Sequence, residues 1–429
     1  MGEPGEDTQP ISRHESWLPD DHPLYRPRHG RQQFALVCAV IFFCAPLVSL
    51  AMLGRPPAIE NRPLHEFPSP SQGWGFFTGL SDWATDWLPL RSAAINLNDS
   101  ISRGVFGEPP SVGTSDSQPI APPSDQGGRP GGGQVNGVYP TVVEGKGGWL
   151  YFGDDSYAQC NPTTPLSDTV KALAAFKQIV QQSGRQFVLV VPPDKSDIFP
   201  DYLPDQYPGK DCAPVAAAQF WKQLGTDIGY VDLKPALYDA SVKLGRPVYF
   251  KTDSHWLYPG ALTMVTKLAE HLEPGVTASW KVGPGKDVTI NTDLPPLLNH
   301  KGTEQTPMPT LAPDGGQNRT QPLLGHSTLE PIQLHTTPVK GMVTDNVAMI
   351  SDSFTEYADP YLAASFSDLT VMHTDFVQRH LDQTAQNLVD SKVVVIEGAE
   401  RLLAGGTSPI LSPGVLATLG QQLAAHPLR

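Results

Sequence analysis

After residue 138, the apolar positions follow two patterns, one helical and one typical of buried strands. Within 167–181, apolar side chains recur every three or four residues, which predicts a helix with Ser167 as its N-cap. The run F-V-L-V-V at 187–191 then predicts a short buried strand. The two patterns recur, with further strands expected at 228–232, 347–350, 369–372 and 393–396 and further helices at 236–244, 260–272 and 376–389.

Short, fully apolar strands that alternate with helices are typical of a parallel sheet covered on both faces. The predicted fold class is therefore α/β, a three-layer αβα sandwich with a mainly parallel sheet of about five strands. In such sheets, functional sites lie beyond the carboxyl ends of the strands. The residues that follow each strand are therefore the place to look for chemistry.

A different pattern occupies residues 34–54, where 21 consecutive residues carry no charge. A helix of this length spans the hydrocarbon core of a bilayer, which is about 30 Å thick. The alternative is a cleaved signal peptide, but the segment is longer than the apolar part of a signal and lacks a clear A-x-A site. We therefore predict one retained transmembrane helix at 34–54.

Arginines before this segment set its orientation. Arg26, Arg28 and Arg31 lie just ahead of it, so the positive-inside rule places the N-terminus in the cytoplasm. Residues 1–33 are then a disordered cytoplasmic tail. We expect a single-pass protein of the cell membrane whose remaining chain lies outside the cytoplasm.

Three segments are expected after the anchor. The apolar spacing in 55–106 predicts a membrane-proximal helical segment, and the Ser, Pro and Gly of 107–137 predict a flexible linker. The α/β domain is expected at 138–429. Many of the 44 prolines and 39 glycines crowd into the first 140 residues and into 284–338, so 284–338 is expected to be loops, linker or poorly ordered chain.

Charge and cysteine content narrow the picture. The chain has 44 acidic and 30 basic side chains and a formal net charge of -14, which argues against a general nucleic-acid binder. Of the four cysteines, Cys160 and Cys212 fall in the expected domain. In an exported domain such a pair is expected to form a disulfide, and the alternative is two free thiols.

The stretch Y-F-K-T-D-S-H-W-L-Y-P-G-A at 249–261 places chemistry after a short apolar run. In an extended chain, residues i and i+2 point the same way, so the Asp253 carboxylate can reach the His255 ring. It would then fix the tautomer and stabilise the imidazolium. A plainer interpretation is that Asp253 caps the next helix and that His255 is an ordinary loop residue.

A second strand end reads V-A-M-I-S-D-S-F-T, residues 347–355. A buried strand that runs into hydroxyls and a carboxylate is a candidate nucleophile turn, with Ser353 as the nucleophile and Ser351 as its nearest rival. A plainer interpretation is a polar turn that starts a helix, in which Asp352 supports the turn or caps the helix. Two such motifs at strand ends of one α/β domain favour a Ser-His-Asp device.

In combination, these motifs resemble the SGNH-hydrolase-like domain of the AlgJ and AlgX type of alginate O-acetylation proteins. The family's G-x-G-W-L-F motif is G-K-G-G-W-L-Y-F at 145–152, and its V-P-x-K-S-x-x-Y-P-x-x-L-P block is V-P-P-D-K-S-D-I-F-P-D-Y-L-P at 191–204. Its D-x-H-W and G-[DT]-S-[FY] motifs are D-S-H-W and S-D-S-F here. E-N-R-P-L at 60–64 and D-W-L-P-L-R at 86–91 resemble the segment ahead of that domain in AlgJ-like members.

The resemblance implies a flavodoxin-like SGNH fold and O-acetyl transfer to a polysaccharide hydroxyl through an acetyl-serine. Carried over by motif, Ser353 is the nucleophile, His255 the general base and acid, and Asp253 the residue that orients the ring. One departure concerns the serine turn, because the glycine ahead of the acid–serine pair is Ser351 here. We expect the backbone N–H of Ser353 to contribute to the oxyanion hole, together with a second donor that the sequence does not identify.

Five residues are further candidates for substrate binding. Trp256 and Tyr258, together with Trp149, can line a sugar groove or pack in the core. Lys195 can bind an anionic group or merely flank a strand end, and Asp352 is the fifth candidate.

The resembling systems also imply a partner. A domain outside the cytoplasm has no acetyl-CoA beside it, so a multi-pass membrane O-acyltransferase is expected to supply acetyl groups to the polysaccharide acceptor. No cofactor is expected, and no metal, since no His/Cys/Asp cluster beyond D-S-H has ligand spacing. Two rival functions remain open, a carbohydrate acetyl esterase with the same three residues and a non-catalytic polysaccharide-binding scaffold.

Overall fold

The computed structural model divides the chain into two units, Met1–Ile101 and Ser102–Arg429. The described residues are 34–40, 44, 67–69, 76, 79, 83, 139–298, 300–321 and 330–428. The tail predicted at 1–33 and the linker predicted at 107–137 lie outside them. The predicted anchor and the membrane-proximal segment are described only at the few positions below 84.

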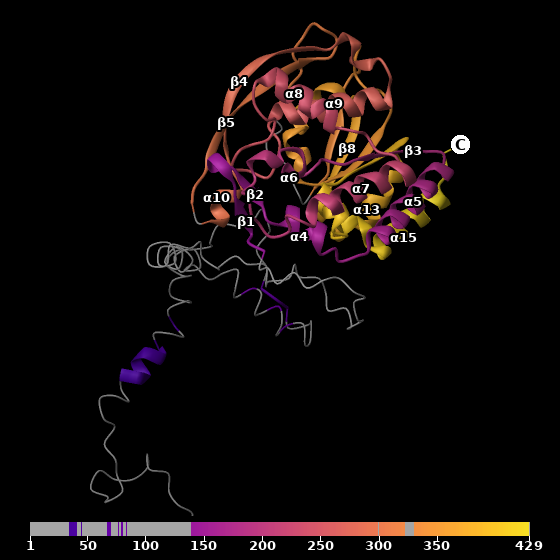
Figure 1. The fold of residues 1–429 in the computed structure, drawn as a ribbon. Helices are drawn as coiled ribbons and strands as arrows, with labels where there is room; N and C mark the ends of the chain where they lie inside the picture. The colour runs from indigo at the N-terminus through magenta and orange to yellow at the C-terminus, as the bar shows by residue number, and fades with distance from the viewer. Residues whose placement is uncertain are drawn as a thin grey trace, which may run out of the picture. The chain divides into compact units, whose positions relative to one another are not determined.

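A five-stranded sheet forms the centre of the second unit (Figure 1). Its order is β3–β9–β7–β8–β6, with the bounds β3 Gln186–Val190, β9 Val393–Glu397, β7 Val347–Ser351, β8 Asp368–His373 and β6 Ile332–His335. The first four strands are parallel neighbours, and β6 pairs antiparallel with β8, so the sheet is mixed. The four parallel strands coincide with the short apolar runs of the sequence.

The second unit also contains α-helices. Their bounds are α4 Asp154–Cys160, α5 Leu166–Gln182, α6 Lys195–Ile198, α7 Ala213–Asp227, α8 Lys234–Leu244, α9 Tyr258–Leu272, α10 Leu294–Leu297, α11 Asp359–Ser365, α12 Thr374–Arg379, α13 Leu381–Val389, α14 Glu400–Ala404 and α15 Pro413–Ala425. The cap prediction for Ser167 is wrong, because α5 already begins at Leu166 and has no side-chain cap. The helix expected at 376–389 is divided into α12 and α13.

Each parallel strand serves two cores, because successive side chains of a strand point to opposite faces. In β7, Val347 and Met349 join one core cluster, and Ala348 and Ile350 join the other. Helices α8, α9 and α11 contribute to the first cluster, and α5, α7, α13 and α15 to the second. The unit is therefore a three-layer α/β sandwich, in agreement with the predicted fold class.

The strand predicted at 228–232 does not form. Residues 228–232 contribute a single isolated bridge, between Val231 and Val190 of β3. Gly229 has a φ of 78°, a left-handed conformation that turns the chain just before the bridge. The fifth strand of the sheet is β6 instead.

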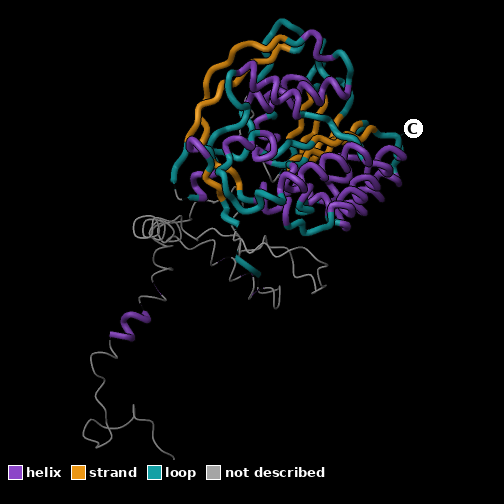
Figure 2. The backbone as a smooth tube through the Cα atoms, viewed as in Figure 1, coloured by secondary structure: helices purple, strands orange, loops and turns teal. Residues whose placement is uncertain are grey.

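The loop prediction for 284–338 is also wrong. This stretch holds β6 and most of a long antiparallel ribbon, β4 Lys281–Asn291 with β5 Thr303–Ala312, whose strands run side by side in orange in Figure 2. Each strand of a two-stranded ribbon has an unpaired edge, where prolines such as Pro284 and Pro307 are tolerated. A Cβ on Gly285 would lie 1.4 Å from the Met308 carbonyl oxygen, so the glycine permits close approach of the two backbones.

Two short elements and a disulfide complete the second unit. Strands β1 Val142–Glu144 and β2 Leu150–Phe152 form an antiparallel pair. Cys160, at the end of α4, is joined to Cys212, which precedes α7, with the Cα atoms 5.7 Å apart. The predicted cysteine pair is therefore bonded.

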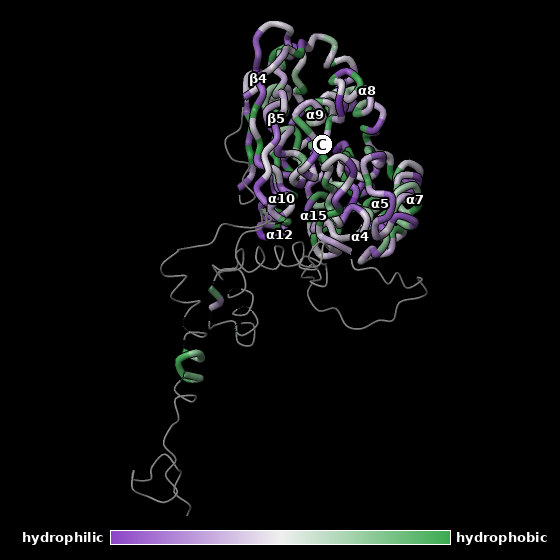
Figure 3. The backbone as a smooth tube through the Cα atoms, turned by 60° about the vertical axis from the view of Figure 1, so that its left-hand side comes forward, coloured by the Kyte–Doolittle hydropathy of each residue, from purple (hydrophilic) through white to green (hydrophobic). Residues whose placement is uncertain are grey.

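In the first unit, residues 34–40 are helical and apolar, and they are coloured green in Figure 3. Phe67 packs its ring against Phe76 and Trp83, with centroids 6.3 and 5.1 Å away. Among the described residues, no single helix has the length and apolar character to cross a bilayer. One pair, Glu400–Leu411 with Pro413–Ala425, bent by 59°, meets that test jointly.

Candidate active site

A hydrogen-bonded chain joins three residues at the carboxyl end of β7. Nε2 of His255 lies 2.8 Å from Oγ of Ser353, and Nδ1 lies 2.8 Å from Oδ1 of Asp253. The side chain of His255 is 11% exposed and that of Asp253 only 2%, whereas Ser353 is half-buried. The structure thus brings together the three residues that the sequence singled out, with the serine at the accessible end.

The turn that presents Ser353 is held by Asp352. Its Oδ1 accepts a hydrogen bond from the Phe354 N–H (3.0 Å), and its Oδ2 accepts one from the Ala399 N–H (2.7 Å). Asp352 thereby caps the short 3-10 helix η7, Ser353–Tyr357. Because Asp352 is buried and both its oxygens bind backbone, the prediction that it binds substrate is wrong.

Below this turn lies a second buried carboxyl. Glu397, at the end of β9, accepts hydrogen bonds from the Asp352 N–H (2.8 Å) and the Thr355 hydroxyl (3.0 Å). Burial and the nearby charge of Asp352 raise the pKa of Glu397 well above its usual range. This shift favours the neutral form of Glu397 beneath the serine turn.

Ser351 is excluded as a nucleophile by its position. It is the last residue of β7, it is fully buried, and its hydroxyl finds no hydrogen-bond partner among the described residues. The departure from the glycine of the resembling family therefore lies inside the strand, ahead of the turn.

The Asp253–His255 contact does not arise as predicted. Residues 251–255 form a bent loop, not the end of a strand, and the only pairing nearby is an isolated bridge between Tyr249 and Trp256. Oδ1 of Asp253 accepts both the His255 backbone N–H (2.9 Å) and its ring N–H. The carboxylate reaches the ring because the loop folds around it, which is a property of Asx turns.

Lys195 lies beneath this loop. Its Nζ donates to the carbonyl oxygens of Asp253 (2.6 Å), Phe250 (3.2 Å) and Lys251 (3.4 Å). Burial lowers the pKa of Lys195 to about 8, although the charges of Asp155 and Asp253 act in the opposite direction. With no exposed surface, Lys195 supports the loop, and the prediction that it binds a substrate anion is wrong.

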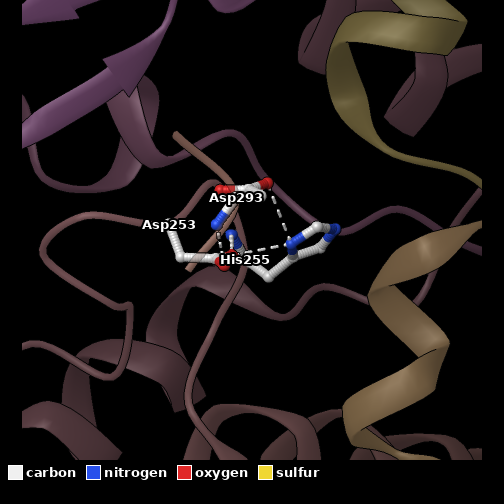
Figure 4. A group of neighbouring side chains, drawn as sticks. All are labelled: Asp253, His255 and Asp293. Atoms are coloured by element: carbon white, nitrogen blue, oxygen red, sulfur yellow. Dashed lines mark hydrogen bonds and ion pairs between the residues drawn. The ribbon is translucent and has the colours of Figure 1, made fainter. Parts of the chain in front are cut away.

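Two carboxylates from the β4–β5 ribbon region also hold the loop, and sequence reasoning missed both. Glu304 of β5 accepts hydrogen bonds from the backbone N–H of Lys251 (3.1 Å) and of Thr252 (2.5 Å). Asp293, just beyond β4, contacts Ser254 and lies beside His255 (Figure 4). Their sequence neighbourhood is rich in proline and glycine, so no local signal marked them.

The charges around the imidazole favour its protonated form. Burial lowers the pKa of His255, but the hydrogen bond and charge of Asp253 and the charge of Asp293 outweigh it, so the net pKa is raised. For Asp253, burial raises the pKa, but the hydrogen bond and charge of His255 prevail and lower it. Asp253 and His255 therefore stabilise each other's charged forms.

Of the three aromatic residues predicted to line a sugar groove, Tyr258 alone is not buried. Trp256 is fully buried and donates its Nε1–H to the Phe354 carbonyl oxygen (2.9 Å), and Trp149 is 8% exposed. The prediction that they contact substrate is therefore wrong. Tyr258 is half-buried, with its ring 5.5 Å from Tyr357, which lies 5.8 Å from the His255 ring. Tyr357 was missed because nothing in its spacing marks it.

Among the described residues, one group has the spacing of a metal site. Asp253, His255 and Asp293 offer ligand atoms within 4.8 Å of one another. The closest of these atoms already share a hydrogen bond, and both Asp293 oxygens accept hydrogen bonds from Ser254. Hydrogen bonding accounts for the cluster, so we do not assign it as a ligand set.

Part of this domain matches a known protein family. Residues 142–328 match the family model described as "SGNH hydrolase-like domain, acetyltransferase AlgX". This range includes Asp253 and His255 and ends before Ser353.

The chain is similar to "Probable alginate O-acetylase AlgJ" of Pseudomonas syringae pv. tomato, with 27% identity over 173 residues, 38% of this chain and 44% of that protein. It is also similar to the protein of the same name from Azotobacter vinelandii, with 25% identity over 224 residues and 49% of each chain. The chain thus spans about half the length of the curated relatives it matches.

Among solved structures, "O-Acetyltransferase Domain of Pseudomonas putida AlgJ" matches 65% of this chain and 98% of its own, with 18% identity and a TM-score of 0.44. The match to the family model and the similarity to the AlgJ proteins confirm the resemblance to the AlgJ and AlgX type of SGNH-hydrolase-like domain that the motifs indicated.

Proposed function

We propose that this protein is an O-acetyltransferase that moves acetyl groups onto hydroxyls of a cell-surface or secreted polysaccharide. The observation that carries the proposal is the hydrogen-bonded chain from Ser353 through His255 to Asp253, with the serine at its accessible end. The similarity to AlgJ-type proteins supports this reaction class over the other uses of such a chain.

In the first step, Ser353 Oγ attacks the carbonyl carbon of an acetyl donor. His255 Nε2 takes the serine proton as the new C–O bond forms, and Asp253 stabilises the imidazolium through the Nδ1–H. The donor's leaving group departs with the proton held by His255, which leaves acetyl-Ser353. The backbone N–H of Ser353 is one donor to the developing oxyanion.

In the second step, the oxygen of a sugar hydroxyl attacks the acetyl carbon. His255 takes the hydroxyl proton, the bond to Ser353 Oγ breaks, and the proton returns to the serine. Atoms and charges balance with no cofactor. Tyr357, whose half-buried ring lies beside His255, and Tyr258, which lies next to Tyr357, form one wall for the acceptor.

The proposal also covers where the reaction takes place and which protein supplies the acetyl groups. The uncharged segment 34–54 anchors the protein in the cell membrane, with the catalytic domain outside the cytoplasm. The disulfide between Cys160 and Cys212 supports an oxidising compartment. A multi-pass membrane O-acyltransferase then supplies acetyl groups to Ser353.

The test compares sugar with water as acceptor. Purified full-length protein in detergent is mixed with p-nitrophenyl acetate, with and without neutral and acidic oligosaccharides, and products are identified by mass spectrometry. Acetylated oligosaccharide that requires Ser353 supports the transferase. Release of acetate alone from every mixture identifies an esterase instead, and no turnover under any condition favours the non-catalytic scaffold.

A further inference from the structure

Asp293 and the loop of Asp253 hold each other through reciprocal hydrogen bonds. The Asp293 backbone N–H donates to Oδ2 of Asp253 (2.8 Å), while Oδ1 of Asp293 accepts from the Ser254 N–H (2.8 Å). Oδ2 of Asp293 accepts from the Ser254 hydroxyl (2.5 Å). Two chain segments far apart in sequence are therefore clamped at the acid–base pair.

These hydrogen bonds prevent the Asp253 carboxylate from rotating. Its Oδ1 faces the His255 ring and its Oδ2 faces the Asp293 N–H, so neither oxygen is free to swing away. Catalytic hydrogen bonds depend on such support, since small displacements of an oriented group reduce rates strongly.

The Asp293 carboxylate also adds charge next to the ring. Its Oδ2 lies 3.5 Å from Nδ1 of His255, whereas Oδ1 of Asp253 lies at 2.8 Å. The Nδ1–H therefore belongs to Asp253, and Asp293 acts on the imidazolium through its negative charge. Arg401 also acts on His255, because its charge opposes protonation, and the ring of Tyr357 lies 5.8 Å from the imidazole.

We propose that Asp293 is a positioning residue for the acid–base pair: its carboxylate clamps the Asp253–His255 loop and supplies a second negative charge to the imidazolium. The inference rests on the proposed function, because in that reaction His255 becomes an imidazolium when it removes the proton of Ser353. Burial and the charge of Asp253 raise the pKa of Asp293 above its ordinary value, although the contacts with His255 and Ser254 act in the opposite direction. At neutral pH the ionised form is the one that Ser254 and the imidazolium favour.

The test uses Asp293→Asn, which keeps an oxygen for the Ser254 N–H but removes the charge. The pKa of His255 is measured directly in the full-length protein by NMR of ¹³C-labelled histidine, with its signal assigned by loss in His255→Asn. We expect it to fall by about one unit, as follows from loss of a nearby opposite charge. The matched control is Asp287→Asn, an exposed carboxylate on the adjoining strand β4, which should leave it unchanged.

Acetylation of the protein by p-nitrophenyl acetate is a second readout. His255 must be neutral to take the serine proton, so the rate rises with pH through the pKa of His255. In Asp293→Asn this rise should move to lower pH by about one unit, and the plateau rate should fall about tenfold. Asp293→Ala, which also removes the clamp, should lower the plateau further.

The two readouts separate this inference from the proposed function. A histidine pKa that is the same in Asp293→Asn and wild type would overturn the role of Asp293, even in an active enzyme. A lowered pKa in a protein that forms no acetyl-serine would support the action of Asp293 on the ring and contradict the proposed reaction.

Discussion

Replacement of Lys195 by methionine tests whether a buried ammonium group holds the loop that carries Asp253. Methionine keeps an unbranched side chain of similar length but removes the donor to three carbonyl oxygens. Leaving buried carbonyl oxygens without their donor costs about 1–3 kcal/mol. We expect Lys195→Met to lose about that much free energy of unfolding at pH 7, and to lose activity because the loop loosens.

The pH dependence of this loss follows from the pKa of Lys195. Burial lowers it from 10.5 to about 8, so between these values the unfolded chain keeps a proton that the native protein has released. Stability of the wild type therefore rises with pH in this window, by about 2 kcal/mol between pH 7 and pH 9.5 at about 1.4 kcal/mol per unit. Methionine cannot titrate, so the variant lacks this rise.

The assay is urea unfolding followed by tryptophan fluorescence at both pH values. Lys171→Met is the matched control, because Lys171 is exposed and its ion pair with Asp168 is a surface contact expected to contribute below about 1 kcal/mol. The reasoning is refuted if Lys195→Met unfolds like this control at pH 7. It is equally refuted if the difference from wild type stays constant between pH 7 and pH 9.5.

Three further substitutions probe the support of the site. Trp256→Phe leaves the buried carbonyl of Phe354 without its donor, so stability should fall by about 1–3 kcal/mol while the KM for acceptor stays unchanged, as measured by unfolding and kinetics. Asp352→Ala leaves two buried backbone N–H groups unpaired, and the rate of serine acetylation should fall at least about tenfold. Cys160→Ser opens the link to Cys212, with a separation of 52 residues, and should cost about 4 kcal/mol relative to the oxidised wild type. A reductant should bring the wild type to the same stability.

The parallel strands were predictable because each is a short apolar run that packs on both faces. Every residue of strands β7 (V-A-M-I-S) and β9 (V-V-V-I-E) is buried, so the sequences of these strands consist mostly of apolar core residues. The antiparallel ribbon was not predictable by this logic. Its residues are mostly exposed or half-buried, and its prolines and glycines, which a ribbon with free edges tolerates, are typical of loops.

The same contrast holds at the site. Ser353, His255 and Asp253 stand in two local motifs, so their sequence neighbours revealed them. Asp293 and Glu304 act through backbone N–H groups of a distant loop, and such contacts leave no local pattern. Trp256 and Lys195 looked like ligand-binding residues because aromatic and cationic side chains near a site often bind ligands. In the structure, Trp256 donates its N–H to the Phe354 carbonyl oxygen and Lys195 donates to the Asp253 carbonyl oxygen, so neither polar group is available to a ligand.

The most direct test of the account is the covalent intermediate itself. Full-length protein is treated with p-nitrophenyl acetate, its intact mass is measured, and the modified peptide is sequenced by mass spectrometry. The account predicts one acetyl group on Ser353, absent from Ser353→Ala, retained in Ser351→Ala, and discharged faster by an acceptor oligosaccharide than by water. An unmodified Ser353 during turnover, or an adduct that persists in Ser353→Ala, would contradict it.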